Sequence, residues 1–417
     1  MKILFVSNCA PWSLDSGMYQ RVYHIVDALA RRHEVTLVAP LSKQQLNGSL
    51  SDALSLRDRC QDVIEVDTKA STLRSMQRFH HWAPFSQRLL DLFSSPLPGA
   101  VRQWMTDDLA EALLDIRQRE VFDLVWAERL STAEMARSAG FQKIVVDVDD
   151  IESVALTRRL KNSPYYGSKP LHYGELTKLN LYEHFLPRRF WRLVVCKHED
   201  RQVFGSDAKN VFVVPNGVAR FPQTPHECEH PGQMLFLGTL SYYPNIDAVQ
   251  FFHTSILPGV RKLCPDAHLA VVGKEPETPI LSLHDGVGCI VHGQVPDVTP
   301  YFNTAALVVA PIRLGSGTRI KVLEALARGK AVVATSTAVE GLDLRPAVDL
   351  EIADTADAFT AACARLLNDA QARQKLGIAG RQRVLERYMW DAIGEPIERV
   401  ITAAAGSAAE EVAEIAL

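Results

Sequence analysis

The chain has no long hydrophobic run, no closely spaced cysteines and no large excess of charge of one sign. No apolar run approaches the roughly 18 residues that a membrane-spanning helix needs. The opening run after Met1 is also shorter than the core of a signal peptide, so we expect a cytoplasmic protein. A net charge of -4 over 417 residues gives no general attraction for nucleic acid. These absences predict a soluble globular protein without a nucleic-acid partner.

The cysteine and histidine patterns offer little to a metal ion. The seven cysteines are scattered along the chain at positions Cys9, Cys60, Cys196, Cys228, Cys264, Cys289 and Cys363. This spacing indicates neither a disulfide framework nor a zinc site. The pair His80-His81 has no other ligand cluster beside it. We therefore expect no metal and no cofactor.

Short apolar segments alternate with helical stretches through both halves of the chain. Strand signals occur at 3–7, 34–39, 63–66, 122–127 and 143–148, then at 211–214, 234–237, 268–272, 289–291, 307–310 and 331–334. This alternation predicts α/β architecture with two doubly wound parallel sheets of the Rossmann-like kind. We expect a first domain over 1–200, a second over 201–390, and a C-terminal helix and tail over 391–417. The turn residues at 215–218 suit a passage between the two domains.

Open α/β sheets bind ligands beyond the carboxyl ends of their strands. Two such sheets are expected to face each other across a cleft, with the loop at Gly17 in the first opposite the site of the second.

Residues 310–335 read as a strand, a glycine turn, a helix and a second strand. Gly315, Ser316 and Gly317 allow a tight turn, and we expect a helix to open at about Thr318. The first amides of that helix have no internal partner, and the helix dipole is positive there. Glycines also let phosphate oxygens come close to the backbone. The stretch therefore predicts a diphosphate site, although an ordinary strand-to-helix turn would use glycine in the same way.

Charged residues in the same stretch support an anion site. Arg319 and Lys321 stand in the expected first turn, where cations oppose the helix dipole unless an anion lies between. Glu324 follows one turn later and could accept both hydroxyls of a ribose. A nucleotide diphosphate fits this set better than free phosphate.

The chain resembles the GT-B glycosyltransferases, and within them the retaining glycosyltransferase family 4, over roughly residues 1–400. The resemblance is strongest in the second half, and looser at 31–38, 145–150 and 213–218. The segments that carry it are Phe236-Leu-Gly-Thr-Leu240, Pro244-Asn245, Val271-Val-Gly273, His292-Gly-Gln-Val295, 311–321 and 323–335. The branch it looks most like serves exopolysaccharide or cell-envelope assembly.

The resemblance implies transfer of a sugar from a nucleotide-diphosphate donor to a saccharide or lipid-linked acceptor, with retained configuration and no metal. Lys321 and Arg319 are placed to stabilise the leaving diphosphate. Glu128, which follows the apolar strand at 122–127, is a further candidate catalytic residue that could position an acceptor or sugar hydroxyl. The donor-binding positions would be Gly17, Asn216, Gly238, Gly293, Val295, Gly315, Ser316, Gly317, Thr318 and Glu324.

Five positions depart from the family's pattern. Ser316 replaces the first of two family glutamates, and Thr239 and Asn245 occupy the region where many members carry an arginine and a lysine. Glu128 lies near the position of a common histidine, and Ser16 replaces a glycine before Gly17. Arg319 and Lys321 are expected to supply the missing positive charge.

Other interpretations remain open at this stage. Asp147, Asp149 and Asp150 could hold a metal as in the other main glycosyltransferase fold, and Glu128 could be a solvated loop carboxylate. A nucleotide-sugar epimerase and an inactive nucleotide-sugar-binding protein would carry the same turn. Basic and aromatic residues at 74–88 and 188–192 could touch the inner face of a membrane, or could be a solvated helix face with its aromatics in the core.

Overall fold

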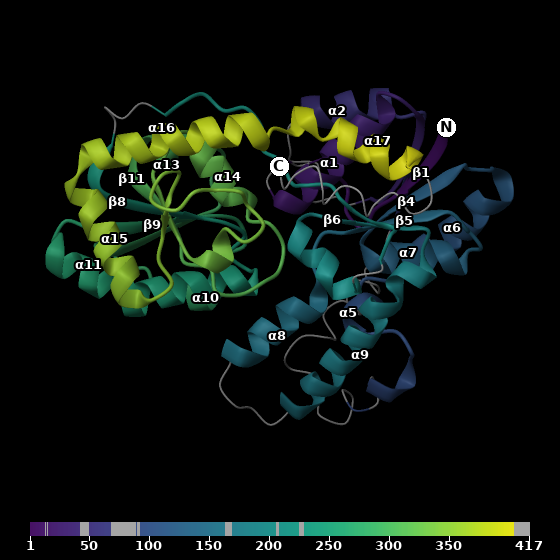
Figure 1. Ribbon diagram of the computed structural model, residues 1–417, viewed down its shortest axis with the longest axis horizontal. Coiled ribbons are helices and arrows are strands. Elements are labelled where there is room, and N and C mark those ends of the chain that lie inside the picture. Colours follow the sequence, from purple (N-terminus) through teal and green to yellow (C-terminus); the bar gives the residue numbers. More distant parts are fainter. Residues whose placement is uncertain are drawn as a thin grey trace. The chain divides into compact units, whose positions relative to one another are not determined.

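The computed structural model describes residues 1–12, 14, 16–41, 50–67, 89, 92–162, 169–205, 208–224 and 229–403. It divides into two compact units (Figure 1). Unit 1 is Met1–Pro215 together with the chain from Ile393 onward, and unit 2 is Asn216–Ala392. Each unit is built around one parallel sheet.

The seven strands of unit 1 are ordered β3-β2-β1-β4-β5-β6-β7 and all neighbours are parallel. Their bounds are β1 Lys2–Val6, β2 Glu34–Pro40, β3 Asp62–Val66, β4 Leu124–Glu128, β5 Ile144–Val148, β6 Arg192–Val195 and β7 Val211–Val213. Most residues of the central strands are apolar and buried, because helices cover both faces of the sheet.

The helices of unit 1 lie on the two faces of this sheet (Figure 1). On one face are α1 Gly17–Ala30, α2 Leu50–Arg59 and α17 Gly394–Thr402. The opposite face carries α6 Asp107–Arg119 and α7 Arg129–Ser138; the remaining helices are α5 Gly99–Arg102, α8 Glu152–Asn162, α9 Lys169–Arg189 and the 3₁₀ segment η2 His198–Phe204. Ser16 caps α1 by accepting a hydrogen bond from the Tyr19 amide at 3.4 Å.

Unit 1 extends beyond the boundary expected at residue 200. The strand at 211–213, expected in the second sheet, is β7 of the first, because it pairs with β6 in the register Leu193↔Val211. The residues after 392 return to unit 1 as α17, where Glu398 contacts the His33 ring at 2.9 Å. The chain passes to unit 2 between Pro215 and Asn216.

Unit 2 has six parallel strands in the order β10-β9-β8-β11-β12-β13. They are β8 His230–Leu237, β9 His268–Val272, β10 Cys289–Gly293, β11 Ala305–Ala310, β12 Val332–Ala334 and β13 Glu351–Ile352. The pair of doubly wound parallel sheets expected from the sequence is confirmed.

The helices of unit 2 also cover both faces: α14 Ile320–Ala327 and α16 Ala370–Arg387 lie on one, and α10 Tyr243–Phe251 and α11 Leu257–Leu263 on the other (Figure 1). The remaining segments are η4 Phe252–Ile256, α12 Thr278–Leu281, α13 Thr299–Thr304, η5 Ser336–Ala338, α15 Ala356–Asn368 and η6 Trp390–Ala392.

Membrane contact was considered for two segments with basic and aromatic residues, 74–88 and 188–192, and the structure describes only the second. Residues 74–88 lie outside the described part of the chain. In the other segment, Phe190 and Arg192 are buried, and Arg189 pairs with Glu134 at 2.5 Å. Arg188 and Arg189 are exposed, so this segment is divided between the core and the surface of unit 1, and its contact with a membrane stays a prediction. Within the described residues, no helix combines the length and apolarity needed to cross a membrane.

Candidate functional site

The sheet of unit 2 changes direction at β8. The chain runs from β8 outward to β9 and β10, then returns to place β11 on the other side of β8. Loops leaving the carboxyl ends of β8 and β11 therefore diverge, which is where open α/β sheets bind ligands. Gly238 directly follows β8, and the turn at 311–319 follows β11.

The turn after β11 is longer than expected. Gly315 has a φ of 89°, a conformation that glycine adopts with little cost. Helix α14 begins at Ile320, two residues later than the expected start at Thr318. Arg319 thus precedes the helix, and its guanidinium folds back to donate hydrogen bonds to the carbonyls of Leu314, at 2.9 Å, and Gly317.

Hydrogen-bond donors surround the open faces of two glycines. A Cβ on Gly315 would lie 2.6 Å from Nη2 of Arg319 and 3.4 Å from the Tyr242 hydroxyl. A Cβ on Gly238 would lie 2.6 Å from Nδ2 of Asn245 and 2.6 Å from Nζ of Lys321. The missing side chains therefore let nitrogens of Arg319, Lys321 and Asn245 come close to the backbone at these glycines, where they form a group of cationic and polar donors suited to phosphate oxygens.

Lys321 lies in the first turn of α14 and reaches the loop after β8. Its Nζ donates to Oδ1 of Asn245 at 2.6 Å and stands 4.5 Å from the centre of the Phe236 ring. Burial, and then the positive charge of Arg319, lower the pKa of Lys321 to about 7. Among the described residues of unit 2, no ion pair joins Lys321 to a carboxylate, and an incoming phosphate would supply an anionic partner.

From the sequence, Asn245 carries part of the family resemblance and departs from the family's charge pattern, but it is not among the expected site residues. In the structure it positions Lys321, and its own amide nitrogen donates to the Thr239 carbonyl at 2.8 Å. The signal available beforehand was the Pro244-Asn245 pair shortly after a strand. The loop after β8 thus does contribute to the site, through an amide instead of a charge.

Glu324 contacts Arg328, the residue that directly follows α14. Arg328 donates to its carboxylate at 3.2 Å, and the Arg328 guanidinium stacks between the rings of Phe221 and Phe302. Burial raises the pKa of Glu324 in spite of this partner. One carboxylate oxygen is engaged, which leaves the other for the expected ribose contact, and that contact stays a prediction.

The remaining donor positions are dispersed. Ser316 is buried within the turn, and Thr318 follows Gly317 just before α14. Gly293 ends β10 with a φ of 69°, two strands away from β8. Val295 packs against the core of unit 2. Asn216 is the first residue of unit 2 and is buried, and Gly17 begins α1 in unit 1.

Unit 1 has a reversal of its own between β1 and β4, and Glu128 stands at the end of β4. Glu128 is 3% exposed, so it is not the solvated loop carboxylate considered from the sequence. It accepts hydrogen bonds from the Asn8 amide at 3.1 Å and from Nε of Arg129 at 2.8 Å. Arg129 has a φ of 71°, which is uncommon for a residue with a side chain. Glu128 therefore holds Arg129 and the loop after β1.

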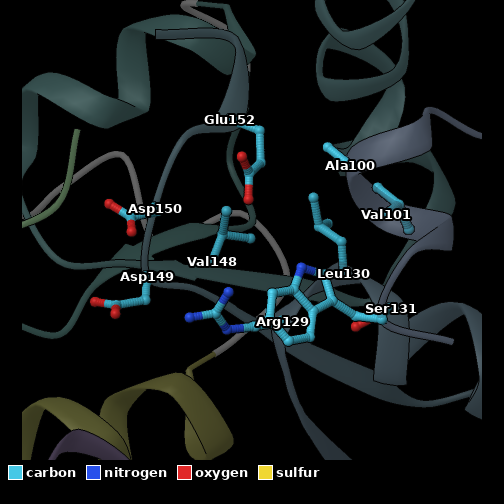
Figure 2. Close-up of a pocket in the computed structure, with 10 residues that line it drawn as sticks. Ala100, Val101, Arg129, Leu130, Ser131, Val148, Asp149, Asp150 and Glu152 are labelled. Carbon is cyan, nitrogen blue, oxygen red and sulfur yellow. The ribbon is translucent and has the colours of Figure 1, made fainter. Parts of the chain in front are cut away.

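A pocket of about 380 Å³, including its open mouth, lies beside Arg129 (Figure 2). It is formed by α5, Trp104, the start of α7, the end of β5 and Glu152 of α8. Burial raises the pKa of Asp149 to about 6 and that of Glu152 to about 7. The sequence reasoning missed Arg129 and Glu152; the one signal was their closeness to strand ends.

The aspartates at the end of β5 differ in their surroundings, although Arg21 lies close to both Asp147 and Asp149. Asp147 is buried and bound by the Arg21 guanidinium at 2.6 Å, whereas Asp149 and Asp150 line the pocket. Within the described ranges, no group of three or more metal-binding side chains is assembled.

Comparisons with known proteins agree with this geometry. Residues 231–369 match the family model described as "Glycosyl transferases group 1". No curated protein matches the chain. Among solved structures, sucrose-phosphate synthase from Thermosynechococcus elongatus superposes with a TM-score of 0.68 at 14% identity, over 96% of this chain and 98% of that one.

Two further structures were determined with ligands. Anabaena HepE in complex with UDP and glucose has a TM-score of 0.65 at 14% identity, over 97% of this chain and 100% of that one. A Staphylococcus aureus (S. aureus) TarM mutant, in complex with Fondaparinux, alpha-GlcNAc-glycerol and UDP, has a TM-score of 0.65 at 11% identity, over 96% and 100%. At these identities the likeness establishes the fold, which is the expected GT-B fold, and the match to the family model lies within unit 2.

Proposed function

We propose that this protein is a retaining glycosyltransferase of the family 4 type, which moves a sugar from a nucleotide-diphosphate donor to a saccharide or lipid-linked acceptor. The observation that carries the proposal is the convergence of Arg319, Lys321 and Asn245 on the open faces of Gly238 and Gly315. UDP is the first nucleotide to test, because HepE and TarM were solved with it. Exopolysaccharide or cell-envelope synthesis is the pathway we infer.

Sugar transfer from a nucleotide-diphosphate donor requires positive charge beside the leaving diphosphate, and this site has it. Breaking the glycosidic bond leaves negative charge on the departing diphosphate, and fixed cations and amides at that position stabilise the transition state. Lys321 and Arg319 supply the positive charge, so we propose that no metal is required. We assign no covalent nucleophile, and the leaving phosphate would accept the acceptor's proton.

The test is product analysis with UDP-glucose and related donors. We expect sugar transfer to a saccharide acceptor, with retained anomeric configuration by NMR and undiminished rates in a metal chelator. An epimerised donor formed without acceptor would instead identify an epimerase. Binding of every donor with no turnover, across a panel of acceptors, would identify an inactive binding protein and overturn the proposal.

Replacing Gly315 by alanine tests the phosphate cradle. In Gly315→Ala the new methyl group would occupy the space beside Arg319, so we expect UDP to bind at least about tenfold more weakly. Isothermal titration calorimetry gives the dissociation constant. Gly286→Ala is the matched control: Gly286 is in the same unit with a φ of 74°, but its open face meets nothing within 4 Å. Equal losses in both variants would mean that backbone strain alone is responsible.

Lys321 predicts a dependence of donor binding on pH. The lysine has a pKa of about 7 in the empty site, and only its protonated form attracts the diphosphate. Affinity for a nucleotide sugar should therefore fall as the pH rises above 7, by up to about tenfold per pH unit. Calorimetry at several pH values measures this slope. Lys321→Arg should bind with little pH dependence over the same range, and a flat profile in the natural protein would contradict the assignment.

A further inference from the structure

Helix α9 packs on unit 1 through one face only. Its buried residues are Leu179, Glu183 and Leu186, and α8 lies beside it (Figure 1). The helix has 21 residues, so it is about 30 Å long. A helix of this length presents a large second face, which is turned away from the core.

The outward face of α9 carries large apolar side chains. Tyr173, Leu181 and Phe185 are 51%, 58% and 46% exposed. They are eight and four positions apart, so they share one stripe of the helix. The neighbouring segment adds Phe93, which is 78% exposed and follows Leu92, whose carbonyl accepts a hydrogen bond from Lys178 of α9 at 3.1 Å. Single exposed apolar residues are ordinary, but several on one stripe mark a contact surface.

Positive charge borders the same stripe. The Arg188 guanidinium lies 5.6 Å from the centre of the Phe185 ring, and the His184 ring meets that ring edge-on at 5.2 Å. The stretch 152–189 has seven basic and three acidic residues, although the whole chain has a net charge of -4. The helices α8 and α9 therefore form a locally basic part of a mildly acidic protein.

The negative charges of α9 are turned inward. Glu175 accepts a hydrogen bond from the Gly99 amide, and the buried Glu183 accepts one from the Ser153 amide at 3.1 Å. Along α9, which the structure describes from end to end, no exposed position holds an aspartate or a glutamate. The outward face is thus apolar, aromatic and basic without a compensating carboxylate of its own.

This composition matches the surface of a bilayer that contains anionic lipid. Apolar side chains can enter the boundary between headgroups and acyl chains, where tyrosine also sits well, and arginines can meet the lipid phosphates. A second copy of the chain fits less well, because two such faces would bring like charges together.

We propose that the outward face of α9, formed by Tyr173, Leu181, Phe185 and Arg188, docks the protein on a bilayer surface that contains anionic phospholipid. The inference goes beyond the proposed function and does not depend on it, since binding to vesicles requires neither a sugar donor nor an acceptor.

Sedimentation with lipid vesicles tests the proposal on the full chain. We expect binding to phosphatidylcholine vesicles that contain about one third phosphatidylglycerol, and at least about tenfold weaker binding to phosphatidylcholine alone. Raising the salt from about 0.05 M to about 0.5 M should weaken the binding, because the charges are exposed. No binding to the anionic vesicles at low salt would overturn the proposal, and so would equal binding to both kinds of vesicle.

Variants of α9 locate the surface. Phe185→Asp should weaken vesicle binding at least about tenfold, and Arg188→Gln about fivefold. Ile378→Asp is the matched control, because Ile378 is 48% exposed on α16 of unit 2, and it should bind vesicles like the natural protein. Cooperative thermal unfolding and unchanged UDP binding show that each variant is folded. Vesicle binding that survives in both α9 variants would exclude this face.

The alternative occupant, a second copy of the chain, has its own signature. Analytical ultracentrifugation without lipid should show a monomer. A dimer that Phe185→Asp dissociates would mean that the face is covered by another copy, and the membrane proposal would then be wrong. Loss of vesicle binding alone leaves the proposed sugar transfer untouched, because that reaction is assayed without lipid.

Discussion

Lys321→Ala is expected to lower the rate of sugar transfer by about a hundredfold to a thousandfold. The reason is that Nζ of Lys321 stands at the open face of Gly238, where it would meet the charge that develops on the leaving diphosphate. Removing a positioned donor to such a charge typically costs this much. Steady-state kinetics with a nucleotide-sugar donor gives kcat and KM separately, and we expect the larger effect on kcat.

Two further variants make the result specific. Lys262→Ala removes an exposed lysine from α11 of the same unit and should leave the rate unchanged. Asn245→Ala removes the amide that positions Lys321 at 2.6 Å and should give a smaller loss, of about tenfold. If the Lys321→Ala variant transfers sugar at nearly the rate of the natural protein, the lysine has no catalytic role.

Arg21→Met is expected to cost about 3–5 kcal/mol of the free energy of unfolding of unit 1. The Arg21 guanidinium is buried, binds Asp147 through Nε at 2.9 Å, and donates to the Val214 carbonyl at 3.0 Å. Without it, a buried carboxylate lies beside Asp149 with no cation to compensate it. Urea denaturation, followed by circular dichroism, measures the change.

A matched control is available on the same helix. Arg31 also pairs with an aspartate, Asp27, at 2.9 Å, but its side chain is 64% exposed. Arg31→Met should therefore cost at most about 1 kcal/mol, since exposed ion pairs contribute little. If the two variants lose the same stability, the buried pair is not a main support of unit 1. Adding Asp147→Leu to Arg21→Met should recover much of the loss, because the unpaired charge is then gone.

Most strands of the two sheets could be located from local hydrophobic runs in the sequence, but some could not. Strands such as β4, β5, β9 and β11 consist mostly of apolar residues, so their positions could be read from the chain with an error of a residue or two. β6 was missed because it begins at Arg192, which looked like part of a basic surface. That arginine is buried because its guanidinium donates to the carbonyls of Val400 and Ala403. Because these partners lie about 200 residues away, the sequence around Arg192 does not indicate that its side chain is buried.

The candidate site divides in the same way. Gly315, Arg319 and Lys321 lie within seven positions, so a glycine turn before a helix was enough to indicate an anion site. The contact of Lys321 with Asn245 joins residues 76 positions apart, and it exists only because β8 and β11 are neighbours. The pocket at Arg129 and Glu152 likewise needs the ends of β4 and β5 side by side.

The sequence by itself determined the α/β alternation, the glycine turn and the cations beside it, because periodicity and turn chemistry act over a few residues. The tertiary structure alone decided which strand closes the first sheet, which amide holds Lys321, and that Glu128 supports Arg129 instead of facing water. Those outcomes depend on strand order and burial, which arise only when distant segments pack together.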